Sequence, residues 1–130
     1  MTDQPGIVVT AAVIRRGELF LVTRRLKDTH LAGYWEFPGG KCEADESCAF
    51  CLAREIKEEL GCDVRIGDEI LTVVHAYPGR PLELHFFECD LVGEPAPLLG
   101  QEIRWVAREQ LASLQFPPAD AELIRKLVEG

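Results

Sequence analysis

The segment between Ser47 and Leu60 constrains the fold more than any other part of the chain. Its apolar side chains recur at the three- and four-residue spacing of an α-helix, at Ala49, Leu52, Ala53, Ile56 and Leu60. Gly61 follows directly, at the position where a glycine commonly ends a helix. We therefore predict a helix with one apolar face, and such a helix is stable in a small protein when that face packs against another element.

Most other regular segments have the composition of strands. Runs of β-branched and apolar residues predict strands at Ile7–Ile14, Leu19–Thr23, Tyr34–Phe37, Ile70–Tyr77, Leu82–Leu91 and Ile103–Val106. The first two runs flank a turn and predict a hairpin. Two short helices are expected at residues 108–114 and 119–128. Strands on both sides of one central helix predict a mixed α+β domain, in which helices cover the faces of a mixed sheet.

Length and charge limit the class of protein. The 130 residues have the size of one domain and contain no repeat or linker, so residues 1–130 are expected to fold as a single unit. No apolar stretch approaches the roughly 18–20 residues that span a bilayer, and residues 1–5 lack the features of a secretory signal. We expect a soluble cytoplasmic protein without a membrane partner. The net charge of −8 disfavours binding to a nucleic acid polymer, but it allows a small polyanion that metal ions bridge to carboxylates.

The cysteines are expected to be reduced. Their number is odd and no secretory signal precedes them, which does not indicate a disulfide framework; they are Cys42, Cys48, Cys51, Cys62 and Cys89. Cys48 and Cys51 have the spacing of half a zinc site, but no second pair follows at ligand spacing. Small buried or half-buried side chains are the better interpretation.

Three acids lie on one face of the predicted helix. Glu55, Glu58 and Glu59 occupy positions i, i+3 and i+4, so their carboxylates are neighbours. Like charges at this spacing destabilise a helix, and a solvated acidic face is the ordinary explanation. The alternative is a divalent cation site, because Mg²⁺ prefers carboxylate and carbonyl oxygens and commonly binds substrate phosphates. Gly39 and Gly40 allow a close backbone approach, through which a carbonyl can join such a site.

The surrounding residues favour the second explanation. Their spacing resembles the GX5EX7REUXEEXGU signature of the Nudix hydrolases, in which U is a bulky apolar residue. Every fixed position of the signature is matched, by Gly40, Glu46, Arg54, Glu55, Glu58, Glu59 and Gly61. Ile56 and Cys62 occupy the two bulky positions. A likeness to the MutT branch of this family continues over residues 23–25, His30 and residues 35–41 and 116–120, and the resemblance covers residues 7–127.

The resemblance implies the Nudix fold, an α/β/α sandwich with a mixed sheet and the helix of the signature at its centre. It implies hydrolysis of (deoxy)nucleoside triphosphates, notably 8-oxo-dGTP, to monophosphate and pyrophosphate. The implied cofactor is Mg²⁺, with Mn²⁺ as a substitute. The implied metal ligands are the Gly39 carbonyl and the three acids Glu55, Glu58 and Glu59, which are also the candidate catalytic residues.

Individual roles follow from the same resemblance. Glu55 is the expected general base, with simple metal ligation as its alternative. Arg54, surrounded by carboxylates, is expected to be an orienting salt-bridge partner rather than a catalyst. Glu46, near the N-terminus of the helix, is expected to be structural. Glu102 is either a further acid of the site or a plain surface residue.

The resemblance also implies a set of nucleotide-binding residues, namely Arg25, His30, Glu36, Phe37, Pro38, Gly39, Arg80 and Asp120. Arg25 is expected to contact phosphate, because a guanidinium suits phosphate oxygens. Lys41 is expected to be solvated, and His75 and His85 to be ordinary strand residues.

Asp120 departs from the MutT pattern, which has Asn at this place. An amide donates and accepts hydrogen bonds, whereas an ionised carboxylate only accepts them. Asp120 is therefore expected to contact base N–H groups or to be held protonated by burial. The alternative is an acid that only favours the start of a helix.

Three functions stay open on the sequence alone. The first is hydrolysis of oxidised purine nucleotides, and the second is hydrolysis of CTP or other pyrimidine nucleoside triphosphates. The third is a nucleotide-sensing module without hydrolysis, against which the intact set of three acids argues. In each case the expected partner is a small-molecule nucleotide, and we expect a monomer.

Overall fold

The computed structural model describes residues 6–29, 31–77 and 80–130, and of residues 76, 77 and 80 it describes the backbone alone. The strands are β1 (Ile7–Arg16), β2 (Leu19–Arg24), β3 (Trp35–Glu36), β4 (Gly39–Lys41), β5 (Asp63–Tyr77), β6 (Arg80–Val92) and β7 (Glu102–Ala107). The helices are α1 (Cys48–Leu60), α2 (Arg108–Leu111) and α3 (Ala121–Glu129), with a 3₁₀ turn at Pro118–Asp120. The predicted hairpin, central helix and later strands are all confirmed.

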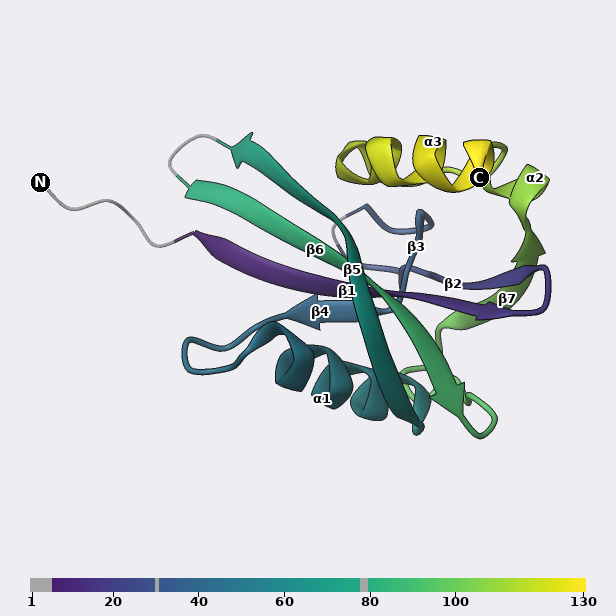
Figure 1. The fold of residues 1–130 in the computed structure, drawn as a ribbon, viewed down its shortest axis with the longest axis horizontal. Helices are drawn as coiled ribbons and strands as arrows, with labels where there is room; N and C mark the ends of the chain where they lie inside the picture. Colours follow the sequence, from purple (N-terminus) through teal and green to yellow (C-terminus); the bar gives the residue numbers. More distant parts are fainter. Residues whose placement is uncertain (1–5, 30, 78–79) are drawn as a thin grey trace, which may run out of the picture.

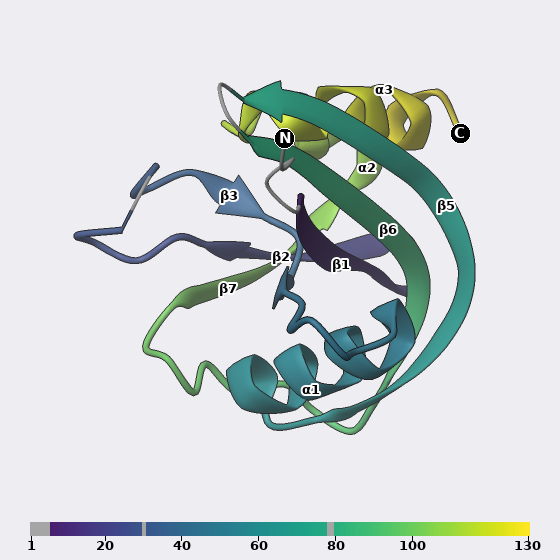
Figure 2. The same cartoon turned by 90° about the vertical axis from the view of Figure 1, so that its left-hand side faces the viewer.

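The strands form one mixed sheet with the order β3-β2-β1-β6-β5. Strand β1 pairs in parallel with β6, whereas the hairpins β1–β2 and β5–β6 are antiparallel. The end of β1 pairs with β2, but its beginning pairs with β4 at Val9–Ala11. Strands β2, β3 and β7 therefore diverge from the rest of the sheet, as Figure 2 shows. This divergence leaves room for a cavity beside the first half of β1.

Helices cover both faces of the sheet (Figure 1): α1 lies on one side, and α2 and α3 lie on the other. The alternation of side chains along β1 separates two cores. Ala12 and Ile14 pack with Leu52, Ile56 and Leu60 of α1. Ala11 and Val13 belong to the opposite cluster, which includes Phe20, Phe86, Leu111 and Leu123. The expected α/β/α sandwich is confirmed.

Both ends of α1 are capped, and the glycine at its C-terminal end was predicted. The Ser47 hydroxyl accepts a hydrogen bond from the Phe50 N–H at 3.1 Å, which satisfies a free donor of the first turn. Gly61 has a φ of 71°, and its N–H donates to the Lys57 carbonyl at 3.0 Å. A residue with a side chain is strained in this left-handed conformation, which explains why glycine ends the helix.

One strand was not predicted, and another begins earlier than predicted. Strand β4 occupies Gly39–Lys41, where the glycines predict the end of a strand. Its pairing with β1 overrides that local preference. Strand β5 begins at Asp63, and register shifts against β6 between Ile66 and Leu71 interrupt the alternation from which its first half could have been predicted.

The expectation that the cysteines are reduced is wrong for one pair. Cys42 and Cys51 form a disulfide, with their Cα atoms 5.3 Å apart. The pairing of β4 with β1 brings Cys42 against the first half of α1, a proximity that the spacing along the chain does not reveal. Cys48, Cys62 and Cys89 are free thiols, and the last two are buried, as expected. Within the described part of the chain, no helix is long and apolar enough to cross a membrane.

Candidate active site

A cavity of about 460 Å³ lies where the two parts of the sheet diverge. Strand β1, the end of β2, the segment from β3 to β4 and the second half of α1 contribute to its walls. It brings together residues that the sequence analysis singled out, namely Arg25, Glu36, Phe37, Gly39, Lys41, Glu59 and Asp120. Residues far apart in the chain therefore meet in one space, as the implied nucleotide site requires.

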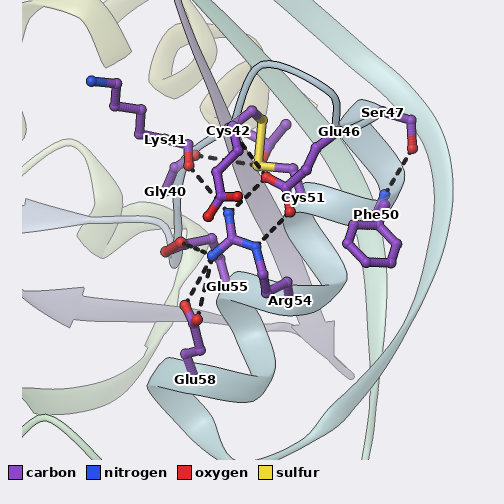
Figure 3. Close-up of polar contacts among 12 residues, drawn as sticks. Gly40, Lys41, Cys42, Glu46, Ser47, Phe50, Cys51, Arg54, Glu55 and Glu58 are labelled. Carbon is purple, nitrogen blue, oxygen red and sulfur yellow. Dashed lines mark hydrogen bonds and ion pairs between the residues drawn. A yellow bond between two sulfur atoms is a disulfide. The ribbon is translucent and has the colours of Figure 1, made fainter.

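Arg54 joins the acids of α1 to the segment before the helix (Figure 3). Its guanidinium donates to both Glu46 oxygens at 2.5 and 2.7 Å, and to Glu55 at 2.9 Å. Glu46 has a side chain only 8% exposed, and the hydrogen bonds from Arg54 lower its pKa to about 2. Arg54 and Glu46 thus lie in a structural ion pair that orients Glu55, in agreement with their expected roles.

Glu55 and Glu59 form a close acid pair at the cavity. Their side chains share a hydrogen bond, and the Gly39 N–H donates to Glu59. Burial, followed by the hydrogen bond with Glu55 and the charges of Glu55 and Glu36, holds the pKa of Glu59 well above its usual range. A Cβ on Gly40 would collide with the Glu55 carboxylate, so the glycine is required for this approach.

The three predicted acid ligands do not surround one point. The Glu58 side chain is 57% exposed and accepts from Arg54 at 3.1 Å. Among the residues that the structure describes, no group of three His, Cys, Asp or Glu side chains is arranged to hold a metal ion. The buried acid pair and the adjacent glycine backbone nevertheless fit a hard divalent cation, because their donors are oxygens and a cation would relieve the repulsion between the carboxylates.

Aromatic and further acidic side chains also lie at the cavity. Phe37 stacks on Phe116 at a centroid distance of 5.3 Å. Glu36 pairs with Arg25 at 2.9 Å, and burial raises the pKa of Glu36 although Arg25 opposes this shift. Asp120 is 6% exposed; its burial, and then the charge of Glu36, raise its pKa to about 7.

Asp120 lies both at the start of a helix and at the cavity. It is the N-cap residue of α3, but its side chain makes no capping hydrogen bond. The side chain lines the cavity instead. Contact of Asp120 with the substrate stays a prediction, as does its alternative, an acid that favours the start of the helix.

The remaining residues named from the sequence lie in varied surroundings. His30 lies outside the described residues, and the side chain of Arg80 is not among those described. Pro38 is buried, and its carbonyl accepts from the Ala12 N–H at 2.8 Å, which makes it a backbone support of the cavity wall. Lys41 is exposed at the rim, as expected. Strand β5 contains His75, as predicted.

Glu102 and His85 are not among the residues that line the cavity. Glu102 accepts from Arg104 at 2.9 Å and lies 3.5 Å from Arg24. Its side chain is exposed and does not line the cavity, although its partner Arg24 does, so its role in the site stays open. His85 of β6 lies between Glu69 and Glu83, at 3.0 and 2.9 Å.

Sequence analysis missed Leu99 and Gln101, which both line the cavity next to Glu59. They lie in the loop between β6 and β7, whose glycines and prolines predict only irregular structure. Gln101 is 7% exposed, an unusual burial for a glutamine. No local signal distinguishes it from any other loop glutamine.

Comparisons with known proteins agree with this geometry. Residues 9–126 match the family described as NUDIX domain. The chain is 36% identical over 129 residues to an 8-oxo-dGTP diphosphatase of Haemophilus influenzae, covering 97% of this chain and 94% of the relative. It is 34% identical over 119 residues to a CTP pyrophosphohydrolase of Escherichia coli, covering 91% and 88%.

Two solved structures have the same fold. The E. coli ORF135 protein superimposes with a TM-score of 0.84 at 33% identity, over 95% of this chain and 88% of that protein. The MutT protein of Methanosarcina mazei superimposes with a TM-score of 0.84 at 26% identity, over 99% and 97%. The resemblance therefore extends over nearly the whole length of both chains.

Proposed function

The chain belongs to the NUDIX domain family, and we propose that it is a pyrophosphohydrolase that cleaves (deoxy)nucleoside triphosphates to monophosphate and pyrophosphate, with 8-oxo-dGTP as the preferred substrate. One observation carries the proposal. A single cavity is lined by Glu59 of the acid pair and by the buried Asp120, with Phe37 also in its wall. It can accept phosphates beside the acids and a base beside the aromatic ring. The relatives named 8-oxo-dGTP diphosphatase support the choice of base.

We assign the cofactor as Mg²⁺, with Mn²⁺ as a substitute. Glu55, Glu59 and the backbone of Gly39 would hold it, together with Glu58 once that side chain leaves Arg54. When bound, such an ion neutralises phosphate charge and lowers the pKa of an attacking water. A protein with a net charge of −8 needs this neutralisation to bind a polyanionic substrate.

The side chains then have distinct tasks. Glu55 accepts the proton of the attacking water, and Arg54, at 2.9 Å, keeps its carboxylate oriented. Arg25, which also lines the cavity, binds phosphate oxygens, and its pairing with Glu36 holds it in place. Phe37, stacked on Phe116, offers an apolar surface to the base.

Hydrolysis of CTP or another pyrimidine nucleoside triphosphate is the second candidate. Asp120 favours it, because the carboxyl stands where the MutT pattern has an amide, and the similar CTP pyrophosphohydrolase supports it. In either case we propose that the protein acts as a cytoplasmic monomer on small nucleotides. The acidic charge supports free nucleotides over a nucleic acid polymer.

A substrate panel combined with Glu59→Gln tests the proposal. With Mg²⁺, the parent protein should release pyrophosphate from 8-oxo-dGTP with a higher kcat/KM than from dGTP, CTP or a 5-substituted dCTP. Glu59→Gln should lower kcat by about 10²-fold or more, the range for loss of a group that acts on the reacting atoms. It should not lower the thermal stability of the metal-free protein, because Gln resembles the protonated acid that burial already favours.

The control variant is Glu122→Gln, which changes an exposed acid of α3 and should leave kcat/KM unchanged. Turnover of Glu59→Gln within a few-fold of the parent would contradict the assignment of α1. A higher kcat/KM for CTP would favour the second candidate. Nucleotide binding by calorimetry without pyrophosphate release would identify a sensor instead.

A further inference from the structure

The loop before β7 donates hydrogen bonds to the last carbonyls of α1, among them the carbonyl of the buried acid Glu59. The last carbonyls of a helix have no partner within the helix. Here the Leu60 carbonyl accepts from the Ala96 N–H at 2.9 Å, and the Glu59 carbonyl accepts from the Leu98 N–H at 3.1 Å. A second donor reaches the Glu59 carbonyl, namely the side-chain amide of Gln101 at 3.0 Å.

Both ends of the Gln101 amide are used. Its nitrogen donates to the Glu59 carbonyl, and its oxygen accepts from the Leu99 N–H at 3.0 Å. The side chain is 7% exposed and lines the same cavity as Leu99 and Glu59. One buried amide therefore links the backbone of the acid to the backbone of the neighbouring cavity wall.

A capping role alone does not explain this link. Ordering a flexible glutamine side chain costs conformational entropy, and the Glu59 carbonyl already has a donor in the Leu98 N–H. Cations are the usual side-chain partners at a helix C-terminus. A neutral amide gives the same hydrogen bond without placing a positive charge beside the acid pair.

We propose that Gln101 is a positioning residue of the active site, which fixes the last turn of α1 so that the Glu59 carboxylate faces Glu55 and Gly39. This inference rests on the proposed function, because it assigns a task to the acid pair. Loss of the amide allows the peptide group of Glu59 to rotate. This displaces the Glu59 carboxylate and lowers the affinity of the acid pair for a divalent cation. Residues that orient metal ligands typically change metal affinity about 10- to 100-fold.

The test is a direct titration with Mn²⁺ alone, followed by electron paramagnetic resonance, for the parent and Gln101→Leu. We expect Gln101→Leu to bind Mn²⁺ about tenfold or more weakly. Steady-state kinetics should show a lower kcat, with a nucleotide KM within about twofold of the parent, because the residues proposed to contact the nucleotide base are unchanged. Gln110→Leu is the matched control, because Gln110 also caps a backbone N–H, that of Ala107 at 2.7 Å, but is exposed and outside the cavity lining.

Unchanged Mn²⁺ affinity together with a lower melting temperature would overturn the inference and leave Gln101 as an ordinary cap. Absence of Mn²⁺ binding by the parent would overturn it as well. If Gln101→Leu does not fold, Gln101→Asn, which keeps the amide on a shorter stem, is titrated instead and the same outcomes decide. A parent that binds Mn²⁺ but hydrolyses no triphosphate refutes the proposed function separately.

Discussion

Two groups of side chains at the cavity are held in different ways. Glu55 and Glu59, which we call the acid end, come from one helix that Arg54 and a disulfide hold against the glycine segment. Phe37 and Asp120, which we call the base end, lie in separate segments, after β3 and in the turn before α3. A contiguous segment with cross-links keeps the two acids in fixed positions, which suits chemistry that tolerates no displacement. Separate segments allow one residue, such as Asp120, to change what is bound without moving the acids.

The largest effect is expected from crowding the acid end. Gly40→Ala places a Cβ where the Glu55 carboxylate lies, so the acid or the strand must move. Because a displacement of about 1 Å can reduce catalysis about 10²-fold, kcat/KM should fall by about that factor for every nucleotide tested. The measurement is pyrophosphate release across the substrate panel.

The control for this experiment is Gly6→Ala, whose new methyl meets only Pro81 at 3.3 Å. It should leave kcat/KM unchanged. If Gly40→Ala lowers kcat/KM for one base far more than for another, the two ends are not separate and the comparison fails.

This contrast also explains what could be predicted from the sequence. The helix of Glu55 and Glu59 was predictable, because its apolar spacing, its caps and its acids all lie within one short segment. The contact of Arg54 with Glu58, which draws that acid away from the pair, depends on side-chain choices that spacing does not determine. Gln101 and strand β4 were missed because each owes its position to a partner far along the chain.

Reduction of the disulfide should loosen the acid end. Cys42 and Cys51 are separated by 9 positions, and closing a loop of this length restricts the unfolded chain by about 2–3 kcal/mol. A reductant should therefore lower the free energy of unfolding by about this amount, measured by urea denaturation. Cys42→Ser should be insensitive to the reductant, whereas Cys48→Ser, which alters a free thiol, should respond as the parent does.

Thiol titration of the denatured protein without reductant decides between the structure and the sequence-based expectation. The disulfide leaves three reactive thiols, Cys48, Cys62 and Cys89. Five reactive thiols, together with a urea midpoint that reductant does not change, would mean that the expectation of reduced cysteines was right after all.

The smallest effect concerns the base end alone. Asp120→Asn replaces a group that is half protonated near neutral pH by an amide that always donates and accepts. The ratio of kcat/KM between two bases should change about tenfold, the scale of about 1.4 kcal/mol for one polar contact. Mn²⁺ affinity should not change, because Asp120 does not contact the acid pair. An unchanged substrate ranking in both Asp120→Asn and Asp120→Ala would remove Asp120 from base recognition.

The charge state of Asp120 determines the direction in which KM changes with pH. The charged groups that line the cavity with Asp120 are Arg24, Arg25, Glu36, Lys41 and Glu59. Burial and then the charge of Glu36 raise the pKa of Asp120 to about 7. Below this pH the carboxyl keeps its proton and can donate to a base carbonyl; above it the carboxylate only accepts. KM should therefore rise as pH increases through about 7 in the parent and less so in Asp120→Asn. Folding stability should also fall with rising pH, because the unfolded carboxyl ionises near its ordinary pKa of 3.8 whereas the native carboxyl keeps its proton up to about pH 7, so the cost of folding grows between these two values. Asp120→Asn should thus gain stability relative to the parent between pH 5 and pH 8. If the two proteins have identical profiles of KM against pH, the pH dependence of KM belongs to Glu36 instead.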